Sequence, residues 1–220
     1  MDLCFRKIQT HKTGSNFLFA GGRHLISYFC FIIILPNVNF TYSYISEINI
    51  TINGTGKQQI LSDYSSYCLY STGYFNSLPN QTLVNGVPQR NNDKYVDNLV
   101  DQTNIITLRW NYQVITCLYM FYDLKNIISI DLSNFDTSKL EFFNCMFEKC
   151  TSLKSINLNN VNTSSAKNMV AMFYECSGLE TLNLSSFDTS KVTTMYAMFN
   201  GCTSLKSLDL TNFETPELLL

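Results

Sequence analysis

The sequence has 220 residues, of which 45% are hydrophobic and 15% are charged, against about 25% charged residues in an average domain. The chain therefore has enough apolar side chains to bury a core, and its surface must be built largely from uncharged polar groups. Its net charge of −2 gives nucleic acid little to bind, and its two histidines, His11 and His24, lie near the start, which excludes histidine-dependent catalysis from the rest of the chain.

Residues 1–43 are predicted to form a targeting segment. Four basic residues and one acid precede an apolar run at residues 25–35. A run of this length is typical of a signal peptide, whereas a transmembrane helix needs about 20 apolar residues. We therefore expect a secreted or cell-surface protein. The alternative is a signal anchor that is not cleaved and holds the chain to the membrane through residues 25–35.

Six Asn-x-Ser/Thr triplets agree with secretion in a glycosylating cell. The possible N-glycosylation sites after residue 43 are Asn49, Asn53, Asn80, Asn162 and Asn183. The alternative is chance, because a chain rich in Asn, Ser and Thr often forms such triplets.

Residues 44–105 are expected to form a small β-rich N-terminal cap domain. Residues 48–52 alternate between isoleucine and polar side chains, as a half-buried strand does. The Asn85-Gly86 pair lies between apolar residues and predicts a tight β-hairpin. We expect this domain to cover the first edge of the structure that follows it.

A repeat of 26 residues dominates the second half of the chain. Met-Phe recurs at residues 120, 146, 172 and 198, and apolar residues follow it at fixed distances without a single insertion. Residues 179–185 have the alternating pattern of a short strand, and residues 192–202 have apolar side chains at helical spacing, with Asp188 as the expected helix N-cap. Each unit is thus predicted to be a strand followed by a helix.

Such units must stack to bury their apolar faces. We predict that residues 106–220 form an α/β leucine-rich-repeat solenoid of about four and a half turns, with a parallel strand ladder on one side and helices on the other. The chain stops inside a repeat, so we expect this edge to be open or truncated and able to meet further repeats or another copy.

The repeat resembles the BspA-like repeat of surface proteins, also described as the bacterial surface protein 26-residue repeat. Residues 198–213 carry the pattern almost in full as Met-Phe-Asn-Gly-Cys-Thr-Ser-Leu-Lys-Ser-Leu-Asp-Leu-Thr-Asn-Phe, and the resemblance covers residues 120–217. It implies a leucine-rich-repeat fold in a cell-surface or secreted protein of a bacterium or protist, with a role in adhesion or host contact. The first unit departs from the pattern, because it has Leu124 where later units have cysteine.

The cysteines after the targeting segment are expected to be core residues. Cys150, Cys176 and Cys202 occupy one repeat position beside apolar neighbours, where a small thiol packs well. A disulfide framework is the alternative, and Cys68 with Cys117 is one pairing that it would allow. We expect no metal and no cofactor, because the chain has no Cys-x-x-Cys pair and equivalent cysteines stack in a row rather than a tetrahedron.

The outward strand positions of the repeat form the candidate concave binding face. Solenoids usually bind their partners on such a face. The candidate residues are Lys154, Asn157, Glu180, Thr181, Asn183, Lys206 and Asp209. They lack the Trp, Tyr and Arg anchors of strong protein interfaces, so the alternative is a merely soluble surface.

The sequence is thus predicted to encode a non-enzymatic, secreted or cell-surface protein that mediates adhesion or recognises a protein or a glycan. A structural surface array without a specific ligand is the alternative. A secreted hydrolase that uses the carboxyl groups of Asp131 and Asp209 is a third hypothesis. No nucleophile with an adjacent base supports any other chemistry.

Overall fold

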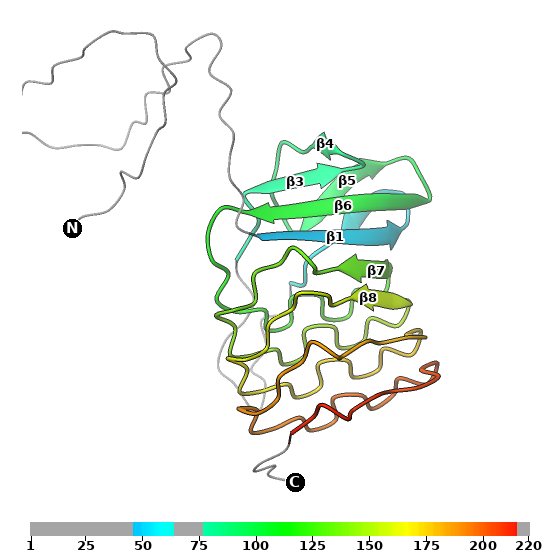
Figure 1. The fold of residues 1–220 in the computed structure, drawn as a ribbon. Coiled ribbons are helices and arrows are strands. Elements are labelled where there is room, and N and C mark those ends of the chain that lie inside the picture. Colours follow the sequence, from blue (N-terminus) through cyan, green and yellow to red (C-terminus); the bar gives the residue numbers. More distant parts are fainter. Residues whose placement is uncertain (1–45, 64–76, 215–220) are drawn as a thin grey trace, which may run out of the picture. The chain divides into compact units, whose positions relative to one another are not determined.

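The computed structural model describes residues 46–63 and 77–214, and all of them belong to one compact unit (Figure 1). The predicted targeting segment, with its apolar run at residues 25–35, lies outside the described residues, as does Cys68. The described part of the chain contains eight strands and no helix.

Six strands form one sheet, and the other two form a small one. The order in the large sheet is β4 (Val87–Pro88), β3 (Gln81–Val84), β6 (Thr103–Trp110), β1 (Ser46–Asn53), β7 (Ile127–Asp131) and β8 (Ser155–Asn157). All of its neighbours are antiparallel except β7 and β8, which are parallel. The small sheet pairs β2 (Gly56–Gln59) with β5 (Tyr95–Leu99) in antiparallel fashion.

The central strands β1 and β6 form because apolar and polar residues alternate along both. Ile48, Ile50 and Ile52 are fully buried, whereas the residues between them are only half-buried on the opposite face. Ile50 lies opposite Ile106 of β6 and Ile130 of β7, so one apolar layer runs across three strands. The predicted strand at residues 48–52 is confirmed. Since β6 runs across the domain division expected between residues 105 and 106, one sheet joins both sides of that division, which itself stays a prediction.

The predicted hairpin is also confirmed. Asn85 and Gly86 connect β3 to β4 with φ values of 49° and 81°. A two-residue turn with positive φ at both positions matches the twist of the flanking strands, and Asn-Gly adopts it at the least cost. The Asn85 Oδ1 accepts the N–H of Ile105 at 2.8 Å, which ties the turn to β6.

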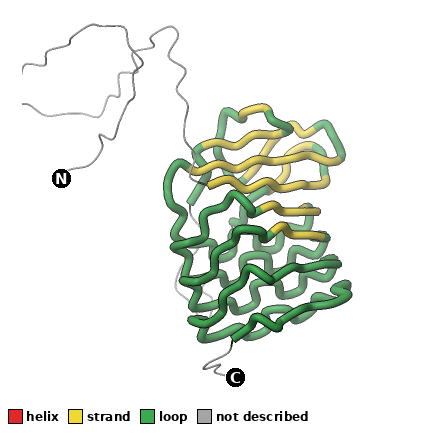
Figure 2. The backbone as a smooth tube through the Cα atoms, in the orientation of Figure 1, coloured by secondary structure: helices red, strands yellow, loops and turns green. Residues whose placement is uncertain are grey.

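The predicted strand–helix solenoid is wrong. Residues 192–202, expected to be a helix, consist of turns and irregular chain with one isolated bridge at Thr194, and residues 179–185 form no strand. In the described chain, the parallel ladder is limited to β7 with β8 and to two isolated bridges, Phe142 with Asn168 and Asn168 with Thr194. The fold is therefore a sheet that continues into successive turns lying one on another, and Figure 2 draws most of these turns as loops.

The physical reason lies in how alternate amides of each turn are bonded. The N–H of Phe147 donates to the carbonyl of Met172 in the next turn at 3.0 Å, whereas the N–H of Met146 donates to Phe143 three residues back at 3.3 Å. A helix would need bonds to the residue four positions back instead. Cys145 and Lys149 have φ values of 55° and 62°, which a right-handed helix excludes. Apolar spacings of three and four residues thus arise here from tight turns.

Residues 26 apart lie against one another in what we call the stacked turns, residues 117–214 including β7 and β8. Phenylalanine rings show this most clearly. Phe121, Phe147, Phe173 and Phe199 form a stack in which successive ring centroids are 5.7, 5.4 and 5.8 Å apart and the planes are within 12° of parallel. Like side chains from successive turns stack on one another, and the core that they form is continuous with the apolar core of the sheet.

Buried threonines also join each turn to the next. The Thr163 hydroxyl donates to the carbonyl of Asp188 at 2.9 Å and accepts the N–H of the same residue at 2.8 Å. Thr137 makes the same pair of bonds to Asn162, and Thr189 makes it to Glu214. Each hydroxyl is almost fully buried, so both of its hydrogen-bonding functions are satisfied where water has little access.

Replacing one of these threonines by its apolar isostere should destabilise the stack. Thr163→Val keeps the shape of the side chain but leaves the N–H and the carbonyl of Asp188 without their partner, so the free energy of unfolding should fall by about 1–3 kcal/mol. Urea unfolding followed by circular dichroism measures the change. Thr203→Val, at an exposed threonine, should change it by less than about 0.5 kcal/mol. Equal stability of the two variants would contradict the role given to Thr163.

Asn144 is a buried side chain without hydrogen bonds. It is 0% exposed, and neither its Nδ2 nor its Oδ1 has a partner among the described residues. The equivalent residues in the neighbouring turns are Leu118 and Val170. Asn168 differs, because its Oδ1 accepts the N–H of Val170 at 2.9 Å. The Asn168 side chain therefore contributes a hydrogen bond to the fold, whereas the Asn144 side chain contributes none.

Asn144→Leu should stabilise the protein. It removes two unsatisfied polar atoms without removing a hydrogen bond, and burying such atoms costs roughly 1–3 kcal/mol. Asn168→Leu is the matched control, which should destabilise because it leaves the N–H of Val170 unpaired. Urea unfolding of both variants gives the two signs, and a destabilised Asn144→Leu would show that the amide has a partner that matters.

Candidate binding face

The predicted binding residues all lie on the stacked turns, in three groups defined by their place in the repeat. Lys154, Glu180 and Lys206 form a charged column, one turn apart. Glu180 donates its N–H to the carbonyl of Lys154 at 3.1 Å, and its own carbonyl accepts the N–H of Lys206 at 3.4 Å. The Lys206 Nζ lies 3.1 Å from a Glu180 carboxylate oxygen, and both side chains are exposed, so this pair contributes little stability.

Asn157, Asn183 and Asp209 continue a row that begins with Asp131, which we call the Asx row. Each side-chain oxygen accepts the N–H of the residue two positions later, at 2.9 to 3.1 Å. This is the bond by which Asp and Asn close a turn on their own backbone. The Asn157 amide also donates to Asp131 at 3.0 Å. These predicted binding residues therefore shape the chain where it leaves the sheet face.

The carboxylates of the Asx row are held in their charged form. Desolvation alone would raise the pKa of Asp131, but hydrogen bonds from Ser133 and Asn157 hold it below its usual value. The backbone N–H and the side chain of Thr211 lower the pKa of Asp209. A glycoside-cleaving pair needs one carboxyl group that stays protonated near neutral pH, and these two are shifted in the opposite direction.

Thr181 belongs to a third group, which we call the hydroxyl row. Register places Thr51 of β1 beside Ser129 of β7, and Ser129 beside Ser155 of β8. The repeat continues the row through Thr181 and Ser207. In the described part of the chain, none of these five hydroxyls makes a hydrogen bond, in contrast to the Asx row beside them. Their donors and acceptors are available to a ligand.

The structure extends this surface onto strands that the repeat does not include. On β1 and β6, the outward residues Asn49, Thr107, Glu47 and Arg109 continue the rows, and Asn49 lies opposite Asp131 of β7. The Thr107 hydroxyl donates to Asn49 at 2.7 Å, and Arg109 Nε donates to Glu47 at 2.6 Å. Alternation at residues 48–52 predicted that Asn49 faces outward, but the sequence gave no sign that β1 would pair with β7. We call the whole surface, from Arg109 to Asp209, the polar face.

The possible glycosylation sites differ in exposure. Asn53, Asn80, Asn162 and Asn183 are exposed, whereas Asn49 is half-buried on the central strand. The Asn49 Nδ2, the atom that would carry a glycan, donates to Glu47 at 3.2 Å. A glycan on Asn183 would stand on the polar face. Whether any of these sites is modified stays a prediction.

The described cysteines are free and lie in or beside the core, as the repeat predicted. The thiols of Cys150, Cys176 and Cys202 donate to the carbonyls of Phe121, Phe147 and Phe173 at 3.0, 3.0 and 3.1 Å. Burial raises the pKa of Cys150 to about 12 and also raises the pKa of Cys176 and Cys202. The suggested Cys68–Cys117 pairing includes a residue outside the described part.

Two kinds of feature are absent from residues 46–63 and 77–214. They contain no group of three His, Cys, Asp or Glu side chains that could hold a metal ion. Nor do they include a helix with the length and apolar character needed to cross a membrane.

Comparison with known proteins identifies one family. The family described as "Mycoplasma protein of unknown function, DUF285" matches residues 97–218. No curated protein and no solved structure is detectably similar to the chain. The resemblance to the BspA-like leucine-rich repeat is therefore corrected on two grounds, since the matching family is a different one and the described fold has no helices. The match includes β6, β7, β8 and the stacked turns, hence most of the polar face.

The thiols should react in the order of their exposure. Cys202 is half-buried, whereas Cys150 and Cys176 are fully buried, and burial raises the pKa of all three thiols. We expect iodoacetamide at pH 8 to modify Cys202 first and the other two more than tenfold more slowly, because the reactive form is the exposed thiolate. Peptide mass mapping over time, with the urea-unfolded chain as the reference for full reactivity, measures the rates. Equal native rates at the three sites would contradict the described packing.

Proposed function

We propose that this chain, which belongs to the DUF285 family, is a non-enzymatic binding protein at the cell surface or in the secreted fraction, and that its polar face recognises glycans. The single observation that carries the proposal is the hydroxyl row, five side chains on adjacent strands and turns with unused hydrogen-bonding groups. The extracellular setting is supported by the N-terminal apolar run and the Asn-x-Ser/Thr triplets.

The chemistry of the polar face favours a glycan over a protein. Its polar residues carry hydroxyl, amide, carboxylate and ammonium groups, and Arg109 at one end is already bonded to Glu47 and Gln81. The exposed Ile105, opposite Thr51, is an apolar member of the same surface. Strong protein interfaces concentrate Trp, Tyr and Arg in a desolvated centre, which this face lacks. Repeated hydroxyls one turn apart instead suit a ligand that itself repeats polar groups. Weak single contacts summed over many units give useful affinity through multivalency.

The carboxylates support binding rather than catalysis. Asp131 and Asp209 each accept a backbone N–H, and both pKa values are lowered. Such groups remain charged acceptors at neutral pH and are poor proton donors. The hydrolase hypothesis thus receives no support from the hydrogen bonds and pKa shifts of these two carboxylates.

Blocking the hydroxyl row should abolish binding. The full chain displayed on fluorescent beads is applied to a glycan array, which reports weak contacts by avidity. Ser155→Arg with Thr181→Arg places two long side chains over adjacent turns without removing any described hydrogen bond, so we expect loss of signal by at least about tenfold while the unfolding midpoint is unchanged.

Ser177→Arg with Thr203→Arg is the matched control, because these residues are also 26 apart and the charge change is the same. It should leave the array signal intact. A signal that survives the Ser155 and Thr181 changes would remove the hydroxyl row as the site. An array without signal, together with binding to purified surface proteins that the same pair abolishes, would make the partner a protein and overturn the glycan proposal.

A further inference from the structure

The hydroxyl row is evenly spaced, and its spacing narrows the class of glycan that fits it. Thr51 of β1 lies opposite Ser129 of β7, and Ser129 lies opposite Ser155 of β8. These three strands are neighbours in the large sheet, as Figure 1 shows. Since neighbouring strands are about 4.8 Å apart, the first three hydroxyl-bearing residues follow one another at that step.

Backbone hydrogen bonds continue the same step through the stacked turns. The N–H of Glu180 donates to the carbonyl of Lys154 at 3.1 Å, and the N–H of Lys206 donates to the carbonyl of Glu180 at 3.4 Å. These residues directly precede the hydroxyl-bearing ones. Thr181 and Ser207 therefore extend the row by one step each.

The row is also nearly straight along the stacked turns. Phenylalanine rings at equivalent positions of neighbouring turns have centroids 5.4 to 5.8 Å apart, and their planes differ by only 5° to 12°. Successive turns are therefore shifted along one axis with little rotation. Over four steps of about 4.8 Å each, the five hydroxyl-bearing residues span about 19 Å.

The Asx row provides a second line of polar groups beside the first. On β7 the two rows pass through Ser129 and Asp131, which are two residues apart, or about 7 Å along a strand. Asn183 uses its Oδ1 to close a turn on the N–H of Ser185 at 3.0 Å. Its Nδ2 makes no hydrogen bond in the part of the chain that the structure describes, so it is available to a ligand that lies on the hydroxyl row.

Charges of both signs flank the hydroxyl row. Lys154 and Lys206 are positive, Glu180 between them is negative, and Asp131 and Asp209 of the Asx row are negative. The row therefore lies in no continuous field of one sign, and a chain that carries the same charge at every unit would be repelled at some of the steps. A neutral ligand meets no such repulsion.

We propose that the hydroxyl row binds one linear, neutral glycan in an extended conformation, such as a chain of β-1,4-linked sugars, with one sugar ring on each strand or turn. The sugars of such a chain follow a nearly straight line at a step close to the distance between neighbouring strands, so each ring meets one hydroxyl. Chains of α-1,4-linked sugars coil and would leave the row after a few rings. The inference rests on the glycan-binding function proposed above and adds the shape and direction of the ligand.

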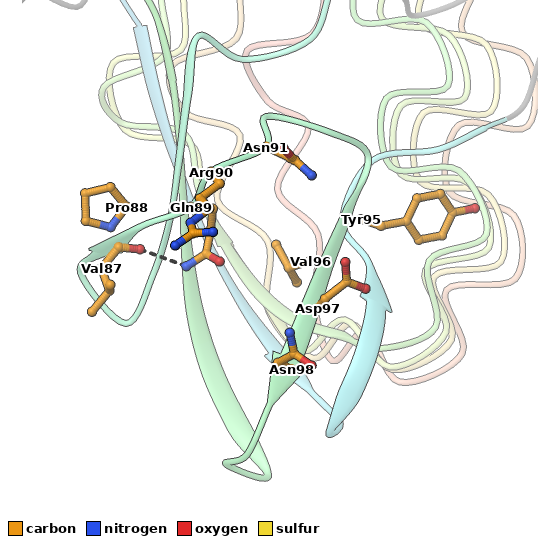
Figure 3. A pocket seen from close by; sticks show the side chains of 9 residues that line it. All are labelled: Val87, Pro88, Gln89, Arg90, Asn91, Tyr95, Val96, Asp97 and Asn98. Carbon is orange, nitrogen blue, oxygen red and sulfur yellow. Dashed lines mark hydrogen bonds between the residues drawn. The ribbon is translucent and has the colours of Figure 1, made fainter.

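A hollow between the β3–β4 hairpin and β5 is a competing place for a sugar (Figure 3). It has a volume of about 340 Å³, and Arg90 and Asn91 are among the residues that line it. That volume is at the lower end of the range of roughly 300–1,000 Å³ for small-molecule sites. The hollow therefore holds a short piece of a glycan, and affinity for it would not grow with the length of the chain.

Titration calorimetry of the full chain with cello-, chito- and malto-oligosaccharides of increasing length tests the proposal. In the cello or the chito series, each added sugar up to about five should raise the affinity by roughly threefold, because it gains about one net hydrogen bond. Longer members should gain nothing more. The malto series should show no such rise.

Two variants test whether the glycan lies along the row. Ser207→Arg blocks the last hydroxyl, so the affinity should level off at about four sugars, one for each remaining step of the row. Ser155→Arg blocks the middle and leaves two hydroxyls on each side, so the affinity should level off at about two sugars. Both variants should keep the unfolding midpoint of the parent, since neither change removes a described hydrogen bond. Arg90→Ala in the hollow is the control and should leave every affinity unchanged.

The outcomes separate this inference from the function on which it rests. Glycan binding that does not depend on chain length, that is as tight for the malto series, or that Ser207→Arg and Ser155→Arg change equally would overturn the extended ligand and leave glycan recognition standing. Binding lost in Arg90→Ala would move the site to the hollow and also overturn it. Absence of binding to these series and to every member of a glycan array would remove both proposals.

Discussion

The bonding of alternate amides is the constraint on which the stacked turns depend. One N–H closes a tight turn within its own repeat unit. The next N–H donates to the carbonyl 25 residues later, as the N–H of Phe147 does to the carbonyl of Met172. Neither the bonds within a turn nor the bonds between successive turns would stabilise the structure alone. Turns without neighbours do not fold cooperatively, and turns that are not bonded to each other would have no fixed register. Buried threonines and the phenylalanine stack reinforce the same spacing. The 26-residue period of the sequence thus matches the spacing of these backbone contacts.

The same constraint divides the polar side chains by role. The Asx row satisfies backbone N–H groups where the chain turns away from the face, so its residues serve the fold first. Thr51, Ser129 and Ser155 of the hydroxyl row lie on paired strands, where the ladder satisfies the backbone, and none of the five side chains of the row makes a hydrogen bond within the described residues. Polar groups that the fold does not need are the ones available for recognition. This separation explains why residues of similar polarity, two positions apart, have different expected effects when changed.

Sequence patterns predicted the strand at residues 48–52, the Asn-Gly hairpin and the period of the second half, because each depends on local chemistry. They failed on the helix, since apolar spacings of three and four residues fit a chain of tight turns as well as a helix. The feature that distinguishes these turns from a helix is the left-handed φ of residues such as Cys145 and Lys149. Neither residue is a glycine, so the sequence does not indicate a left-handed conformation at these positions. The columns of the binding face followed from the period, whereas its extension to Asn49 and Arg109 required knowing that β1 lies between β6 and β7. Asp188 was predicted to be a helix N-cap. Its carboxylate does accept the N–H of the residue two positions later, Ser190, but this bond closes a turn and does not begin a helix.

The stack of Phe121, Phe147, Phe173 and Phe199 also bears on how such a protein can change over evolutionary time. A ring that packs on equivalent rings above and below is indifferent to how many neighbours the array contains. A duplicated or deleted unit leaves every remaining ring with the same kind of neighbour, whereas an insertion of one residue changes the spacing between the two rings that flank it. Unequal recombination between copies is thus tolerated where small insertions are not. The array can therefore be lengthened or shortened without disturbing the ring stack only by whole repeat units.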